Sequence, residues 1–150
     1  MPKQETIERA RQDAREGKAP STQAGEFIKE EIDEIRAGKH GARSTKQAIA
    51  IGLSKARRAG VDVPAPKKGR VSEQTRRKAE QDSRKGHEGV RRKPSAKRSR
   101  ATLKALRREG TAAASPQALS RQARSAAAKR SPAERSASAR KAARTRKAES

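Results

Sequence analysis

Apolar residues recur three and four positions apart through the first 60 residues, which is the spacing that places them on one face of an α-helix. The pattern predicts three helices, over residues 3–16, 21–37 and 45–59, and glycines follow them at positions 17, 38 and 60. Ser44 and Gln47 have the spacing of a capping box at the start of the third helix. Ten large side chains form the candidate core: Ile7, Phe27, Ile28, Ile32, Ile35, Ile49, Ile51, Leu53, Val61 and Val63.

The pattern changes at Pro64 and Pro66. Residues 1–66 hold 11 large apolar side chains and a net charge of +3, whereas residues 67–150 hold 5 such side chains and a net charge of +20. We therefore divide the chain into a small helical head (1–63), a Pro/Lys-rich linker (64–70) and a basic tail (71–150). A core of this size predicts a head that is only marginally stable by itself.

The tail contains helix signals without an apolar stripe. Residues 71–85 and 96–109 fit helices, and a 16-residue repeat over 115–146 begins each of its units with Ser followed by Pro, a favoured helix start. Cations project from every side of these segments, and low apolar content with high net charge is typical of disorder. The predicted fold class is mainly α: a three-helix unit followed by a long tail that is largely disordered, or helical only on a polyanion.

The composition of the chain argues against several classes of function. The chain of 150 residues has 40 Lys and Arg against 17 Asp and Glu, a formal net charge of +23, one aromatic residue and no cysteine. The chain has few apolar and aromatic side chains with which to line a catalytic cavity, so we expect that it is not an enzyme. His40 and His87 are isolated in the sequence, which predicts no metal site and no cofactor. The chain also shows no targeting signal and no membrane-spanning stretch, and the expected location is cytoplasmic, at the nucleoid.

The positive charge predicts a polyanionic partner, most simply duplex DNA. The candidate DNA-binding residues of the linker and tail are Lys67, Lys68, Arg70, Arg76, Arg77, Lys78, Arg91, Arg92, Lys93, Lys97, Arg98, Arg100, Arg107, Arg108, Arg121, Arg124, Lys129, Arg130, Arg140, Lys141, Arg144, Arg146 and Lys147. A second set, around the third predicted helix, is Arg43, Lys46, Lys55, Arg57 and Arg58. For this set, phosphate contact is favoured over base readout in the major groove.

The second predicted helix is rich in acidic side chains, at Glu26, Glu30, Glu31, Asp33 and Glu34. One hypothesis is that these carboxylates dock the chain's own basic tail until DNA competes for it. The favoured alternative is a solvated face on which Lys29 and Asp33 form an i, i+4 pair.

Two runs in the head, APSTQAGEF at 19–27 and GKHGARSTKQAIAIGLSKARRAGV at 38–61, resemble a family of short basic bacterial proteins. That family is classed as a domain of unknown function and is often labelled DNA-binding or plasmid-stabilisation protein. The resemblance implies a bacterial, DNA-associated protein and assigns no binding or catalytic residue. The tail is similar in composition to the basic tails of linker histones.

These observations predict a non-specific, histone-like DNA-binding protein that neutralises duplex DNA and compacts or bridges it, with a link to plasmid stabilisation. Two alternatives stay open: an RNA- or ribosome-associated basic protein, and an adaptor whose head binds a protein partner, or a second copy, while the tail tethers it to nucleic acid. A single aromatic residue argues against recognition of single strands by base stacking.

Overall fold

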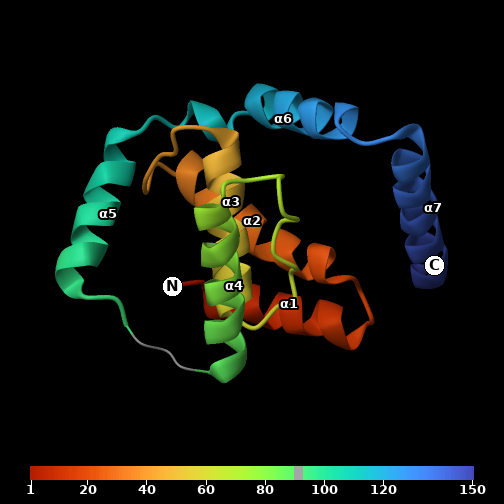
Figure 1. Ribbon diagram of the computed structural model, residues 1–150, viewed down its shortest axis with the longest axis horizontal. Coiled ribbons are helices and arrows are strands. Elements are labelled where there is room, and N and C mark those ends of the chain that lie inside the picture. Colours follow the sequence, from red (N-terminus) through yellow and green to blue (C-terminus); the bar gives the residue numbers. More distant parts are fainter. Residues whose placement is uncertain (90–92) are drawn as a thin grey trace. The chain divides into compact units, whose positions relative to one another are not determined.

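The computed structural model describes residues 1–89 and 93–150 of the chain (Figure 1). Within these residues it forms two compact units, Met1–Ser115 and Pro116–Ser150. The first unit contains α1 (Gln4–Arg15), α2 (Pro20–Arg36), α3 (Thr45–Arg58), α4 (Glu73–Glu88), α5 (Ala96–Arg108) and the short 3₁₀ helix η1 (Ala112–Ala114). The second contains α6 (Pro116–Ala128) and α7 (Pro132–Glu149). No described helix is both long and apolar enough to cross a bilayer.

The three helices predicted for the head are confirmed. Gly17, Gly38 and Gly60 follow their C-terminal ends with left-handed φ angles of 75°, 74° and 93°, a conformation that glycine adopts without a steric cost. At the start of α3, the Ser44 hydroxyl accepts a hydrogen bond from the Gln47 backbone N–H at 3.1 Å. The Gln47 side chain accepts from the Arg43 backbone N–H at 2.6 Å, one residue earlier than in a capping box.

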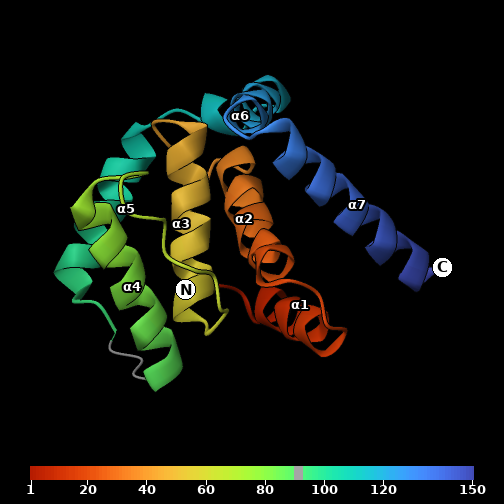
Figure 2. The ribbon, with the colours of Figure 1, turned by 45° about the vertical axis from the view of Figure 1, so that its right-hand side comes forward.

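Alanine and a few large side chains build the core of the helical bundle. Phe27 and Ile35 are fully buried, and α1, α2 and α3 approach one another through Ala10, Ala24 and Ala56, which are also buried. Figure 2 shows α3 between α2 and α4, and α3 packs against both. The predicted core is confirmed for Phe27, Ile32, Ile35 and Val61, whereas Ile28, Ile49 and Ile51 are only half-buried.

Helix α4 extends this bundle beyond the predicted head. It packs against α3 through buried Ala79 and Asp82. Near its end, the backbone of Gly86 lies so close to α3 that a Cβ atom there would sit 1.9 Å from the Arg57 carbonyl oxygen. The contact uses small residues and one carboxylate, so a count of large apolar side chains does not reveal it.

The segment that contains α5 and η1 returns to the bundle near the start of α3. The Thr45 hydroxyl donates to the Ala113 carbonyl at 2.7 Å, and the Arg36 guanidinium donates to the Ala114 carbonyl at 2.9 Å. In the connection between α2 and α3, the Gly41 N–H donates to the carbonyl of Leu106, the last apolar residue of α5, at 2.9 Å. The first unit thus runs from α1 through η1.

The second unit follows the 16-residue repeat. Helices α6 and α7 begin at Pro116 and Pro132, each directly after a serine. At α7 the capping box is complete, because the Ser131 hydroxyl accepts from the Glu134 N–H while the Glu134 carboxylate accepts from the Ser131 N–H. The helix starts predicted from the repeat are therefore confirmed.

The predicted fold class is wrong in its second half. The chain is mainly helical, as expected, but residues 71–89 and 93–150 form α4 to α7 and η1 rather than a long disordered or conditionally helical tail. Like-charge pairs on a helix cost only about 0.2–0.5 kcal/mol each. The Ala, Arg and Lys that dominate these segments are strong helix formers, and each serine cap contributes about 1 kcal/mol. Propensity and capping therefore outweigh the repulsion.

The surroundings of Gly86 and Gly25 predict opposite effects on stability when each glycine is replaced by alanine. Gly86→Ala forces α4 away from α3 and should lower the free energy of unfolding by about 1–3 kcal/mol. Gly25→Ala, in α2 with nothing within 4 Å of the added Cβ, should raise it by about 1 kcal/mol through helix propensity. Chemical denaturation followed by circular dichroism measures both. Stabilisation by Gly86→Ala would show that α4 does not pack as described.

Candidate functional site

Positive charge is unevenly distributed between the parts of the chain. Residues 1–89 carry 21 Lys and Arg against 14 Asp and Glu, whereas residues 93–150 carry 17 against 3. The excess of cations therefore belongs mainly to α5 in the first unit and to α6 and α7 in the second, and each of these elements is a candidate for contact with nucleic acid.

Helix α5 is the most strongly cationic element of the first unit. Leu103 and Leu106 are half-buried, and the helix contains no acidic residue. Its six cations are exposed and form no ion pair among the described residues: Lys97, Arg98, Arg100, Lys104, Arg107 and Arg108. Lys104 is absent from the residues predicted from sequence, although its four-residue spacing from Arg100 and Arg108 places all three on one face.

The second unit exposes the predicted cations of α6, of α7 and of the connection between them, namely Arg121, Arg124, Lys129, Arg130, Arg140, Lys141, Arg144, Arg146 and Lys147. Arg135 of α7 is exposed as well and extends this set. Arg130 also has a structural contact, because its guanidinium donates to the Ser138 hydroxyl and, at 3.3 Å, to the Glu134 carbonyl. The remaining cations of α7 project from all sides of the helix, as its sequence predicts.

The predicted cations of α4 differ from those of α5 because they have carboxylate partners in the same helix. Arg76 pairs with Glu73 and Glu80, and Arg77 lies 3.7 Å from Glu73. Lys78 donates to Asp82 at 3.0 Å. Among the other predicted residues, Lys67, Lys68, Arg70 and Lys93 are exposed, and Arg91 and Arg92 lie outside the described residues.

Most of the cations predicted on the third helix belong to the fold. Arg57 is buried and donates to the carbonyls of Val63 at 3.2 Å and Pro64 at 3.0 Å, and burial lowers its pKa. Arg58 donates to Asp82 at 3.0 Å, and Lys55 donates to Glu31 at 2.7 Å. Two other predicted residues, Arg43 and Lys46, are exposed. Helix α3 is therefore mainly a structural helix of the bundle.

Asp82 joins α4 to α3. Its carboxylate is 2% exposed and accepts hydrogen bonds from Ser54 at 2.6 Å and from Arg58 and Lys78 at 3.0 Å each. Burial alone would raise the pKa of Asp82, but these three hydrogen bonds lower it below its usual value. The ionised carboxylate thus stabilises the folded chain.

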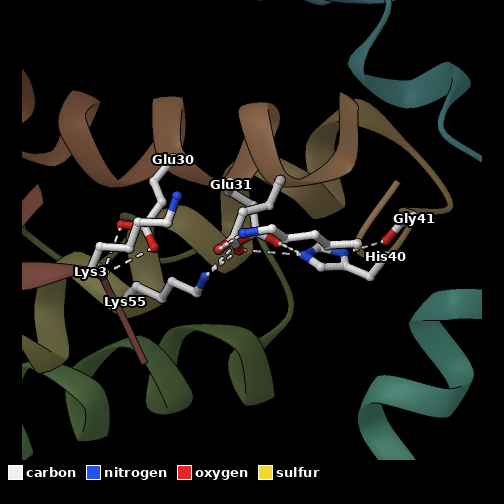
Figure 3. A network of polar contacts seen from close by, with 8 residues as sticks. Lys3, Glu30, Glu31, His40, Gly41 and Lys55 are labelled. Carbon is white, nitrogen blue, oxygen red and sulfur yellow. Dashed lines mark hydrogen bonds and ion pairs between the residues drawn. The ribbon is translucent and has the colours of Figure 1, made fainter. Parts of the chain in front are cut away.

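The acidic side chains of α2 contact residues 3–55 rather than the basic tail. Glu26 accepts from Arg9 at 2.6 Å, and Glu30 accepts from the Lys3 backbone N–H at 3.2 Å, next to the start of α1 (Figure 3). Lys29 and Asp33 form the expected i, i+4 pair at 2.7 Å. Within the described residues, no carboxylate of α2 pairs with a cation of the tail, and the face is partly buried rather than solvated.

Glu31, Glu34 and His40 form a second polar cluster where α2 ends (Figure 3). Glu31 is 1% exposed, and its Oε2 accepts from the Lys55 ammonium at 2.7 Å. Its Oε1 lies 3.1 Å from His40 Nε2 and has no hydrogen-bond partner. Burial would lower the pKa of Lys55, but the hydrogen bond to Glu31 and the nearby carboxylates raise it, so the ammonium stays charged.

Neither histidine is isolated in space. His40 Nε2 also lies 3.8 Å from Glu34, and its Nδ1 lies 3.0 Å from the Gly41 carbonyl oxygen. The exposed His87 contacts the Ser83 carbonyl at 2.7 Å and Asp62 at 2.5 Å, and these contacts raise its pKa. The sequence signal for the cluster of Glu31, Glu34 and His40 is two glutamates three residues apart on one helix, followed by a histidine six residues later. The prediction of an isolated His40 missed this pattern.

Residues 3–68, which include α1, α2 and α3, match the profile of DUF6496, a family of unknown function. This match agrees with the resemblance of the head to a family without an assigned function, and it brings no DNA-binding or plasmid-stabilisation label with it. No curated protein and no solved structure matches the chain.

The buried carboxylate of α4 yields a prediction about stability and pH. Asp82→Asn removes charge-assisted hydrogen bonds and should lower the free energy of unfolding by about 1.5–3 kcal/mol at pH 7. Because the folded-state pKa of Asp82 is depressed, its stabilising contribution is present above its unfolded-state pKa of about 4 and is lost as the pH falls through the folded-state value. The two proteins should therefore converge in stability in acid. Denaturation at pH 7 and pH 3 measures this.

Glu80→Gln, which alters an exposed partner of Arg76 in the same helix, is the matched control. It should change stability by no more than about 0.5 kcal/mol. An equal loss of stability in Asp82→Asn and Glu80→Gln would show that the buried carboxylate of Asp82 stabilises the fold no more than an exposed one.

Proposed function

We propose that the protein binds nucleic acid, with duplex DNA as its main partner, through the cations of α5, α6 and α7. The observation that carries this proposal is the set of six exposed cations on α5, a helix without a single acidic residue. Their charges face solvent and are free to neutralise phosphates. Binding releases the counterions condensed on DNA, which supplies most of the affinity of such contacts.

The dimensions of α5 suit this role. A helix of 13 residues is about 20 Å long, and the same length of duplex carries about twelve phosphate charges. The phosphate charges along this length outnumber the cations of α5, so the cations that share one face, among them Arg100, Lys104 and Arg108, can each neutralise a phosphate without any change in the helix backbone. Contacts of this kind position a protein on DNA but do not read its base sequence.

The lack of aromatic side chains favours a duplex over a single strand. Phe27 is the only aromatic residue of the chain, and it is fully buried in the core. Proteins that bind single strands usually stack exposed aromatic rings on the bases. We therefore assign the protein a sequence-independent, histone-like activity at the nucleoid that neutralises and compacts DNA. The resemblance noted for residues 19–61 adds plasmid stabilisation as a cellular setting.

The proposal is tested with two double variants of the full chain. Arg98→Gln with Arg100→Gln removes two unpaired cations of α5, whereas Arg76→Gln with Arg77→Gln removes two cations that have carboxylate partners in α4. Binding to a labelled 25-base-pair duplex is measured by fluorescence anisotropy across a range of salt concentrations. The α5 variant should bind more weakly and reduce the salt slope by about 2, whereas the α4 variant should leave the slope unchanged.

Equal slopes for both variants and the original chain would contradict the proposed interface. A double-stranded RNA of the same length is the second arm of the experiment. Binding to it at least ten times tighter than to DNA would contradict the choice of DNA and favour the RNA-associated alternative.

A further inference from the structure

The cluster at the end of α2 has the geometry of a metal site. Glu31, Glu34 and His40 each offer one ligand atom, and these atoms lie within 4.8 Å of one another. The contact distances are 3.1 Å from His40 Nε2 to Glu31 Oε1 and 3.8 Å from His40 Nε2 to Glu34 Oε2. Two ligand atoms held 2.0–2.1 Å from a tetrahedral ion are about 3.4 Å apart, so both distances are close to those of a shared ion. We propose that these three residues bind a divalent transition-metal ion of the Zn²⁺ class.

The hydrogen bond of His40 fixes the ring in the form that a metal ligand needs. The Gly41 carbonyl only accepts hydrogen bonds, so the Nδ1 atom that lies 3.0 Å from it carries a proton. In a neutral ring, the lone pair then resides on Nε2, which faces Glu31 (Figure 3) and lies 3.8 Å from Glu34 Oε2. A backbone carbonyl on the other ring nitrogen is a common second partner of metal-binding histidines.

The unpartnered oxygen of Glu31 is the independent sign of a ligand. Glu31 is 1% exposed, and its Oε1 has no hydrogen-bond partner even though His40 Nε2 is 3.1 Å away. A proton on Nε2 therefore does not satisfy this oxygen in the observed arrangement, and an unsatisfied buried acceptor destabilises the fold. A metal ion between the three ligand atoms would satisfy it.

The ligand types favour a divalent cation of this class. Lys55 pairs with the other oxygen of Glu31, at 2.7 Å, and so leaves Oε1 available. Lys55 also lies 3.5 Å from Glu34 Oε2, and Lys39 lies 3.9 Å from Glu34 Oε1, so two ammonium groups balance the charge of the two carboxylates. Imidazole together with carboxylate suits Zn²⁺ and its neighbours in the first transition row, whereas Mg²⁺ and Ca²⁺ prefer oxygen ligands alone.

Such an ion would connect α2 to the loop that holds α5. His40 and Gly41 lie between α2 and α3, and the Gly41 N–H donates to Leu106 of α5 at 2.9 Å. Fixing His40 against Glu31 and Glu34 would order this loop and the hydrogen bond that depends on it. The proposed metal is therefore a structural ion, and its binding does not rest on the nucleic-acid activity.

The test is a titration of the full-length protein with Zn²⁺, followed by competition with a chromogenic chelator. We expect one equivalent to bind and the midpoint of thermal unfolding to rise, with no such effect of Mg²⁺. The two histidines of the chain supply matched variants. His40→Gln should weaken Zn²⁺ binding at least ten-fold, whereas His87→Gln, at the exposed pair with Asp62, should leave it unchanged.

Glu34→Gln, at a partly exposed ligand, provides a second variant if circular dichroism shows that His40→Gln does not fold, and it should also weaken binding at least ten-fold. Three results would overturn the proposal: no bound Zn²⁺, an equal loss of Zn²⁺ affinity in His40→Gln and His87→Gln, or unchanged Zn²⁺ affinity in Glu34→Gln.

Discussion

Buried carboxylates that hold the cations of α3 are the constraint on which the rest of the structure depends. Glu31 of α2 binds Lys55, and Asp82 of α4 binds Arg58, so α3 is joined by ion pairs to the helix on either side. The chain has few large apolar side chains, and its core relies on alanines that allow helices to approach closely. Glu31 and Asp82 are almost fully buried, so removal of Lys55 or Arg58 leaves a buried carboxylate short of a partner, which makes these pairs important for the arrangement of the bundle.

This arrangement divides the cations of the chain into those that pair with carboxylates and those that face solvent. Several cations of α3 and α4, such as Lys55, Arg58 and Arg76, pair with carboxylates and serve the fold, whereas those of α5 face solvent in a helix that contains no acid. The same residue types therefore have two roles, and position in the fold separates them. Net charge alone predicts a polyanionic partner, but only the ion pairs show which cations are free to bind one.

Much of the secondary structure can be predicted from the sequence because local signals determine it. Glycines after α1, α2 and α3, and serines before α4, α5 and α7, mark helix ends through backbone geometry and capping. The helical structure of the tail could not be predicted from its apolar content. Helix α4 packs through Ala79, Asp82 and Gly86, none of which counts as a large apolar residue. The cluster of Glu31 and His40 depends on how the chain turns after α2, which residue spacing does not specify.

The separation of paired from unpaired cations is tested most directly by nuclear magnetic resonance of the arginine side chains in the full-length protein. Duplex DNA is added, and the Nε–Hε signals are followed. The account predicts changes at Arg98, Arg100, Arg107 and Arg108 of α5, together with unchanged signals from Arg57 and Arg76, which the fold already holds. Changes at Arg57 and Arg76 with unaffected arginines in α5 would contradict it.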